Sequence, residues 1–340
     1  MSAFSPCGGS QLSRLGFRSR NVLDRAFAMP ARINDTLLNA SLYFYPDEAS
    51  ASEGRNIGGS GFLVGVPFED GTDGYIMWAV TNKHVIDSGN WTIRLNRQNG
   101  GVFCIDTNEL EWSFHPEGDD LAVRPLYIPR DAKTNFIPVS MMLTQSATKA
   151  LDIGPGDEAF AVGRFISRDG LQRNSPTVRF GRIAQNADEE VAYDGYRQKA
   201  WLVEIMSLNG YSGAPVFCIL DSNYYRDVEM TMKGDIDPFF ADMPSRFNPA
   251  KKMNSLAPGV FPSGPFLLGV DCCMIRLWSP VCDVRRQEVP SQNQVSLNTG
   301  MMGVIPSWRL REMLLAHPKR GQVEALARAE FLGAGDAAAS

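Results

Sequence analysis

An all-β fold of two six-stranded antiparallel barrels followed by a C-terminal helix is the architecture that this sequence predicts. From about residue 38 onward, short apolar segments alternate with turn residues, and the 31 glycines and 21 prolines are spread along the chain. This distribution is typical of many short strands separated by turns. The segments also fall into two sets of six, and six strands are enough for one small barrel.

The elements follow one another in the order that two barrels require. The first expected barrel spans about 31–140 and the second about 150–306, with a connection near 127–150. The strands expected in the first cover residues 42–45, 61–66, 75–81, 91–96, 102–105 and 121–126. Those expected in the second cover residues 158–166, 178–184, 201–206, 214–220, 267–274 and 301–305. Pro306-Ser307 is a typical helix start, so a helix is predicted over 306–316, and the tail at 317–340 is predicted to be helical over 322–332.

Residues 1–30 differ in composition from the rest of the chain. Four arginines precede residue 28 but only one acidic residue does, and the segment lacks the apolar block of a secretory signal. We expect a disordered arm, or an extension upstream of a true start at Met29. A cytoplasmic location follows as the expectation, with an Arg-rich organellar transit peptide as the minor alternative.

The bulk properties exclude several classes of partner. The net charge is −5, so nothing favours binding to nucleic acid or to an anionic membrane. No apolar run reaches the roughly 18 residues that a membrane-spanning helix needs. The six cysteines show no paired spacing, and we expect reduced thiols, with no structural metal and no cofactor.

The segment 209–217 carries the strongest functional signal. Two glycines flank Ser212 within sequence that is otherwise strand-like, which predicts a tight turn that holds the serine hydroxyl out of the sheet. The amides of Gly210 and Ser212 would then point at one spot and form an oxyanion hole. Because a serine hydroxyl is a poor nucleophile at neutral pH, this hypothesis requires a histidine as base and a carboxylate to orient it.

Both partners occur upstream of the serine. His84 ends an apolar strand, whereas His115 and His317 have no such setting, and we expect His115 to be a structural neighbour of the acid loop. Asp120 leads directly into an apolar run that would bury its side chain near a histidine. Asp119 is the less favoured candidate for the acid. The predicted catalytic residues therefore follow the order His84, Asp120, Ser212.

Together these segments resemble the trypsin/chymotrypsin-like serine peptidases, and within them the bacterial trypsin-like type. The resemblance rests on four motifs, at residues 58–64, 81–85, 120–123 and 210–216. It implies a chymotrypsin-like double barrel over about 31–316 and a serine endopeptidase that acts on protein or peptide substrates through an acyl-enzyme intermediate. In that scheme His84 is the general base, Asp120 orients it, and no cofactor takes part.

The sequence departs from the family pattern near the serine and beyond it. Tyr211 replaces the aspartate that pairs with a new N-terminus in digestive members, so activation by that salt bridge is not expected. Met206 falls where the family has the base of its primary pocket and carries no carboxylate, so a preference for Arg or Lys is not supported and a medium apolar or polar side chain is expected. Val270 and Asp271 fall on the second wall, where the Asp271 carboxyl group leaves a different preference open. An insert at about 221–264 is expected to cover or narrow access to the site.

Two other classes of function stay open at this stage. A catalytically silent or partner-gated relative would use the double barrel as a binding module for a regulatory protein partner. An esterase of the α/β-hydrolase type is the second alternative, but its G-x-S-x-G elbow would need glycine where Ala214 stands. Such enzymes also run in the order serine, acid, histidine. The sequence therefore favours the peptidase.

Overall fold

The computed structural model describes residues 32–56, 58–164, 172–193, 195–220, 264–281 and 294–336. The chain divides into two units, 1–33 and 34–340, and the elements below all belong to the second unit. The predicted N-terminal extension at 1–30 and nearly all of the predicted insert at 221–264 lie outside the described residues.

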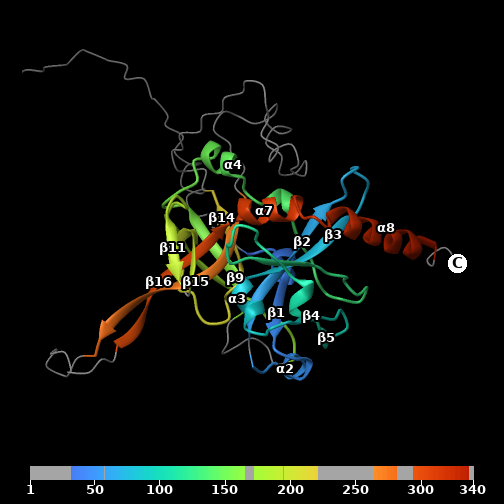
Figure 1. Ribbon diagram of the computed structural model, residues 1–340, viewed down its shortest axis with the longest axis horizontal. Coiled ribbons are helices and arrows are strands. Elements are labelled where there is room, and N and C mark those ends of the chain that lie inside the picture. The colour runs from blue at the N-terminus through green and yellow to red at the C-terminus, as the bar shows by residue number, and fades with distance from the viewer. Residues whose placement is uncertain are drawn as a thin grey trace, which may run out of the picture. The chain divides into compact units, whose positions relative to one another are not determined.

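The first half of this unit is an eight-stranded sheet (Figure 1). Its path runs β5-β4-β1-β2-β3-β7-β6, and β8 pairs with β2 in parallel. The strands are β1 (Ser41–Tyr45), β2 (Gly59–Pro67), β3 (Tyr75–Thr81), β4 (Thr92–Asn96), β5 (Val102–Ile105), β6 (Ser113–Phe114), β7 (Ala122–Pro125) and β8 (Ile137–Pro138).

Among the described residues of this half no closed six-stranded barrel is found, because no ladder joins the end strands β5 and β6. A 3₁₀ turn, η1 (Glu109–Glu111), interrupts the chain between them, and β6 is only two residues long. Side chains bridge this part of the chain instead: the Trp112 indole donates to Thr107 Oγ1 at 3.1 Å, and the Thr107 hydroxyl donates to the Trp91 carbonyl at 2.7 Å. Side-chain hydrogen bonds thus connect the segments near β5 and β6, where the prediction required a backbone ladder.

The second half is a closed barrel of six strands, as predicted. Its order is β10-β13-β16-β15-β14-β9. The strands are β9 (Glu158–Gly163), β10 (Thr177–Gln185), β13 (Trp201–Glu204), β14 (Pro215–Ile219), β15 (Phe266–Pro280) and β16 (Gln294–Pro306). A separate hairpin, β11 (Glu190–Tyr193) with β12 (Tyr196–Lys199), was not predicted. The ladders are antiparallel except β2 with β8, which argues against the parallel sheet of an α/β-hydrolase.

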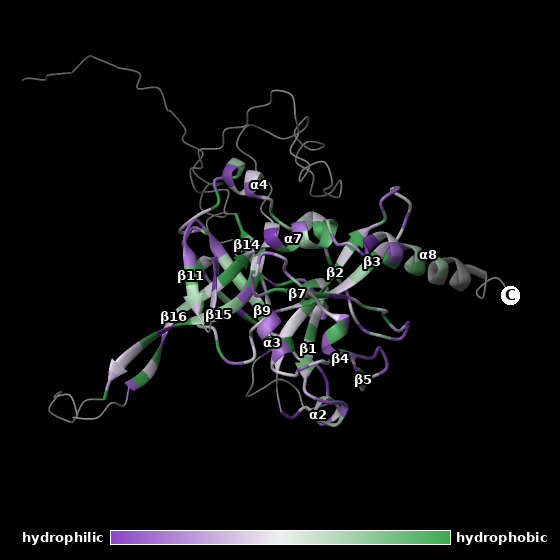
Figure 2. Ribbon diagram, in the orientation of Figure 1, coloured by the Kyte–Doolittle hydropathy of each residue, from purple (hydrophilic) through white to green (hydrophobic). Residues whose placement is uncertain are grey.

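Strands β15 and β16 are longer than the sequence predicts. Their pairing continues to Pro280 opposite Gln294, beyond the part of β15 that pairs with β14. Four large apolar side chains on this outer part are exposed: Leu277, Trp278, Val295 and Leu297. We call residues 275–280 and 294–299 the arm; Figure 2 shows apolar positions along it.

Helices occupy the connections and the C-terminal region. They are α1 (Asp35–Asn39), α2 (Glu48–Glu53), α3 (Lys83–Asp87), α4 (Gln145–Ala150), η2 (Val139–Met141), α7 (Ser307–Leu315) and α8 (Arg320–Asp336). Helix α7 packs on β15 and β16, with the rings of Trp201 and Trp308 5.9 Å apart, and α8 contacts β3. These two helices correspond to the two predicted at the C-terminal end. Among the described helices, none combines the length and apolar character needed to cross a membrane.

Candidate active site

The histidine and the acid meet because two strands of the first sheet are neighbours. Strands β3 and β7 pair with Thr81 opposite Ala122, so the residues just after β3 and just before β7 lie at one end of the sheet. The His84 amide donates to Asp120 Oδ1 at 2.9 Å, and His84 Nδ1 lies 2.6 Å from Asp120 Oδ2. Asp120 is fully buried. Its carboxylate therefore holds both the backbone and the ring of His84.

A third donor reaches this carboxylate from the unpredicted hairpin. The Tyr193 hydroxyl donates to Asp120 Oδ2 at 3.0 Å, and Gln198 Nε2 donates to the Tyr193 oxygen at 2.7 Å. Gln198 Oε1 accepts from the Asp120 amide at 2.7 Å, which closes the network. Burial raises the pKa of Tyr193, so the phenol stays protonated and acts as a donor. No sequence motif pointed to Tyr193 or Gln198.

The other candidate acid serves a structural purpose. Arg309 of α7 donates from Nε to Asp119 Oδ2 at 2.5 Å, and His115 Nδ1 lies 3.5 Å from the same oxygen. Burial lowers the pKa of His115, and this effect outweighs the neighbouring Asp119 charge, so the imidazole is neutral near pH 7. His115 is thus a neighbour of the acid loop, as expected, and Asp119 ties that loop to α7.

Ser212 lies on a turn that needs glycine. Gly210 and Gly213 have φ of 90° and 87°, a region that side chains with a Cβ rarely adopt. At Gly213 a Cβ would also lie 2.2 Å from the Ser60 carbonyl oxygen and 2.5 Å from Thr81 Oγ1. The Ser60 amide donates to the Ser212 carbonyl at 2.9 Å, so strand β2 holds the serine directly.

The amides expected to form the oxyanion hole are free of internal partners. The Gly210 carbonyl accepts from the Ser60 hydroxyl at 2.6 Å, which fixes the direction of that peptide. Within the described part of the chain, neither the Gly210 amide nor the Ser212 amide donates a backbone hydrogen bond, whereas the Tyr211, Gly213 and Ala214 amides each do. Two N–H groups are therefore available beside the serine hydroxyl.

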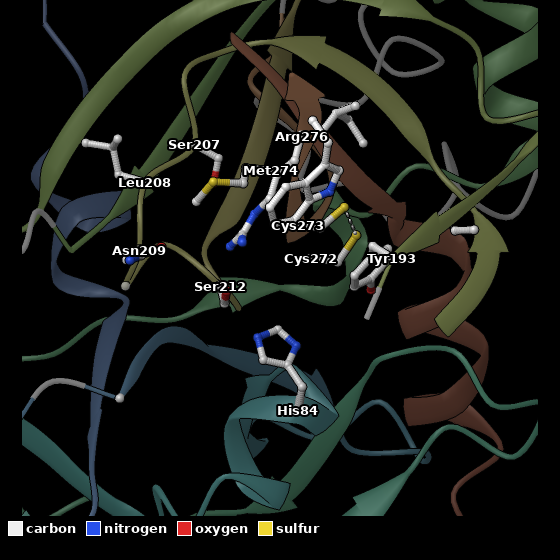
Figure 3. A pocket seen from close by; sticks show the side chains of 15 residues that line it. His84, Tyr193, Ser207, Leu208, Asn209, Ser212, Cys272, Cys273, Met274 and Arg276 are labelled. Carbon is white, nitrogen blue, oxygen red and sulfur yellow. Dashed lines mark hydrogen bonds between the residues drawn. The ribbon is translucent and has the colours of Figure 1, made fainter. Parts of the chain in front are cut away.

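Ser212 and His84 line the same cavity, whose volume is about 460 Å³. Figure 3 shows the two side chains facing one another, with one imidazole nitrogen toward the serine. The loop at 207–210, just before Ser212, and strand β15 supply most of the cavity wall. The lining residues are Gly58, His84, Ala192, Tyr193, Ser207, Leu208, Asn209, Gly210, Ser212, Cys272, Cys273, Met274, Ile275, Arg276 and Trp278.

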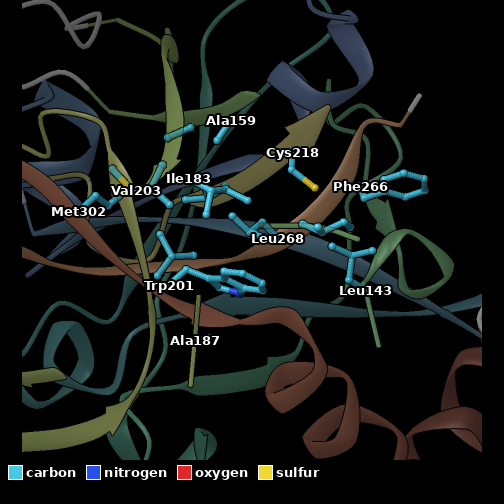
Figure 4. Packing of buried hydrophobic residues seen from close by; sticks show 14 of the residues in the cluster. Leu143, Ala159, Ile183, Ala187, Trp201, Val203, Cys218, Phe266, Leu268 and Met302 are labelled. Carbon is cyan, nitrogen blue, oxygen red and sulfur yellow. The ribbon is translucent and has the colours of Figure 1, made fainter. Parts of the chain in front are cut away.

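Buried apolar side chains pack the interior of the barrel next to the strand that follows Ser212 (Figure 4). Strand β14 follows the serine directly, and its Val216 and Cys218 belong to one buried cluster with Trp201, Leu268 and Met302. Tyr211, just before the serine, is fully buried in the same cluster, and its hydroxyl lies 2.5 Å from Thr177 Oγ1. Close packing of this kind limits movement, so the serine is held in position by the barrel.

The three residues predicted for the substrate pocket do not line this cavity. Met206 is 53% exposed, and its contribution is a backbone carbonyl that accepts from Arg179 at 2.8 Å. Val270 is fully buried. Asp271 is also fully buried, and its Oδ2 accepts from the hydroxyl of Ser207, which does line the cavity. Their assignment to the substrate pocket therefore stays a prediction.

The described cysteines and acids form no metal centre. Cys272 and Cys273 lie side by side on the cavity wall with their sulfur atoms 3.8 Å apart, and all four described cysteines are free thiols. Among the described residues, no three His, Cys, Asp or Glu side chains converge in a way that could hold a metal ion. Cys7 and Cys282 lie outside the described ranges.

Comparison with known proteins identifies no family. No protein-family model matches the chain, and no curated protein matches it either. Among solved structures it is similar to the MamO protease domain from Magnetospirillum magneticum in its apo form, with 13% sequence identity and a TM-score of 0.44. The match covers 82% of this chain and 97% of that chain. A likeness this distant has no bearing on the chemistry of the site.

Proposed function

We propose that this protein is a serine endopeptidase with His84, Asp120 and Ser212 as its catalytic residues. One observation carries the proposal: Asp120 binds both the amide and Nδ1 of His84, and the other side of that imidazole faces Ser212 across a shared cavity. This is the arrangement in which a neutral imidazole can take a proton from a serine hydroxyl.

The proposed reaction is acyl transfer in two steps. Ser212 Oγ attacks the peptide carbonyl carbon while His84 Nε2 takes the hydroxyl proton, and the same proton then passes to the leaving amine as the C–N bond breaks. Water next attacks the carbonyl carbon of the acyl-enzyme ester and gives a proton to His84. His84 then returns that proton to Ser212 Oγ as the ester C–O bond breaks, which releases the carboxylic acid and restores the serine. Asp120 keeps the Nδ1–H tautomer in place and stabilises the imidazolium that forms in each step.

The unpartnered amides of Gly210 and Ser212 would bind the oxyanion of the tetrahedral intermediate. Donors that are already in position cost nothing to reorganise during the reaction, and each contributes about 3 to 4 kcal/mol to the lowering of the barrier in measured peptidases. The glycine at 210 matters here, because its φ of 90° is a backbone conformation that a residue with a Cβ rarely adopts.

We further propose that the enzyme needs no zymogen cleavage. Tyr211, which replaces the aspartate of digestive relatives, is fully buried, and its hydroxyl lies 2.5 Å from Thr177 Oγ1. The Arg179 guanidinium covers its ring at 5.4 Å. These contacts anchor the residue before the serine without any charged N-terminus.

A partner-gated binding module remains the second candidate function. The observation in its favour is the arm, whose exposed side chains include Leu277 and Trp278, each more than half accessible. Such apolar groups on neighbouring strands are typical of surfaces that contact another protein. Under this hypothesis a regulatory partner would bind the arm next to the cavity.

Covalent labelling with an alkyl fluorophosphonate separates the two functions. We expect the full chain to be labelled, and Ser212→Ala and His84→Ala to lose labelling while keeping the wild-type circular dichroism spectrum. Ser52→Ala, an exposed serine on α2, is the matched control and should label normally. A folded wild-type chain that resists labelling would refute the peptidase proposal and leave the binding module.

A further inference from the structure

A positively charged side chain, that of Arg276, extends into the candidate active-site cavity without an acidic partner among the described residues. Arg276 lies on β15 with an exposed side chain, and Figure 3 shows its guanidinium group directed into the cavity near Ser212. Within the described part of the chain it has no ion pair and no side-chain hydrogen bond. An arginine in a concave site with unused donors is a recognition group for carboxylates, because its planar fork matches the two oxygens.

The described part of the wall adds no negative charge that would compete for this guanidinium. Among the described residues that line the cavity there is neither Asp nor Glu. The carboxyl group that lies just behind the wall, on Asp271, is fully buried and accepts a hydrogen bond from Ser207 at 3.0 Å. Burial raises the pKa of Asp271 to about 7, so this group is largely uncharged in mildly acidic solution.

An irregularity in β15 explains why Arg276 faces the cavity. Neighbouring side chains on a regular strand point to opposite faces, yet the consecutive residues Met274, Ile275 and Arg276 all line this cavity. The register of β15 on β16 shifts between Met274 and Arg276. Such a shift bends a strand and redirects the side chains beside it.

We propose that the cavity binds a carboxylate-bearing side chain, so that the substrates are acidic peptides cleaved next to Glu or Asp. This inference rests on the serine endopeptidase function proposed above. Arg276 is then the residue that determines specificity, and the substrate carboxylate pairs with its guanidinium while the scissile carbonyl sits at Ser212.

The test uses peptides that differ only in Glu, Gln or Lys at each position flanking the cleavage site. Glu and Gln have nearly the same shape, so their ratio of kcat/KM isolates the charge. We expect Glu to be preferred over Gln by about 5- to 30-fold in kcat/KM. This range lies between the contribution of an exposed ion pair and that of a buried one, because the site is partly open to solvent. Arg276→Glu should reverse the order, so that Lys is preferred over Glu.

Arg130→Glu supplies the matched control, since Arg130 is exposed on the first half of the unit and outside the cavity. It makes the same change in net charge and should leave the Glu-to-Gln ratio unaltered. Arg130→Glu should also be labelled by an uncharged fluorophosphonate at the wild-type rate, because Arg130 does not line the cavity. Glu and Gln peptides that occupy the site should also protect Ser212 from the fluorophosphonate, and the degree of protection compares the two side chains without cleavage.

The outcomes distinguish this inference from the function on which it rests. A wild-type chain that is labelled but treats Glu and Gln alike would overturn the acidic specificity and leave the peptidase intact. A Glu preference that survives Arg276→Glu would also overturn it, because another residue would then be responsible. A folded chain that neither labels nor cleaves any peptide overturns both.

Discussion

Replacing Asp271 with Asn tests whether a buried carboxyl group limits the stability of this fold at neutral pH. The side chain is fully buried, its Oδ2 accepts from Ser207 at 3.0 Å, and its Oδ1 has no hydrogen-bond partner among the described residues. Burial is the largest influence and raises the pKa of Asp271 from 3.8 to about 7. The hydrogen bond from Ser207 and the charge of His84 act in the opposite direction but are weaker.

The sign of the pH effect follows from this direction. Because the folded-state pKa exceeds the unfolded value, the native chain binds more protons than the unfolded chain between about pH 4 and pH 7. The free energy of unfolding therefore falls as the pH rises through that window and levels off above it. A rise from 3.8 to about 7 corresponds to about 4 kcal/mol at about 1.4 kcal/mol per pKa unit, which is an upper bound.

Asp271→Asn keeps the shape but removes the ionisation. The amide N–H₂ of the asparagine would take the position of Oδ1, which has no hydrogen-bond partner among the described residues. An unsatisfied buried donor costs about 1 to 3 kcal/mol. The net expectation is a gain of about 1 to 3 kcal/mol in the free energy of unfolding at about pH 8, and no gain near pH 4.

Urea unfolding, followed by circular dichroism from about pH 4 to about pH 8, measures the free energy of unfolding of both chains at each pH. Asp188→Asn, at an exposed aspartate, is the control and should track the wild type at every pH. If the curves of wild type and Asp271→Asn run parallel from about pH 4 to about pH 8, Asp271 ionises without cost and the argument from burial is wrong.

Two further substitutions test how the site is held. Tyr193→Phe removes one of the hydrogen-bond donors to Asp120. Because a hydrogen bond to a charged group is lost, kcat should fall about 10- to 100-fold with little change in KM. Steady-state kinetics measures this, with Tyr127→Phe at an exposed tyrosine as the control. Gly213→Ala should cost more than 2 kcal/mol in urea unfolding and abolish fluorophosphonate labelling, because a Cβ there meets backbone at 2.2 Å. Gly100→Ala also has a positive φ but open space around it, and should cost only about 1 kcal/mol.

The catalytic candidates were predictable because each has a local signal. Ser212 lies between two glycines, and both have the positive φ that the turn hypothesis required. His84 and Asp120 lie at strand ends that become neighbours once β3 pairs with β7. Their roles in catalysis stay predictions, but their meeting at one end of the sheet followed from the strand pattern.

The support for Asp120 could not be predicted, because it comes from far along the chain. Tyr193 lies 73 residues after Asp120, on a hairpin with no distinctive motif, and only the folding of that hairpin over the acid brings the two together. The same limit applied to the predicted pocket. Met206 was chosen by its spacing from Ser212, whereas the side chains that enter the cavity depend on the register of β15.

The sequence by itself determined the class of fold, the two C-terminal helices, the turn at Ser212 and the order of the candidate residues. These features depend on alternation of apolar residues, on glycine at positive φ and on helix-start signals, which all act between residues close together in the chain. Tertiary structure alone decided that, among the described strands, those of the second half form the closed barrel and that Arg276 faces the cavity. Those outcomes depend on strand register and on contacts between distant segments, whose free energies appear only when the whole core packs.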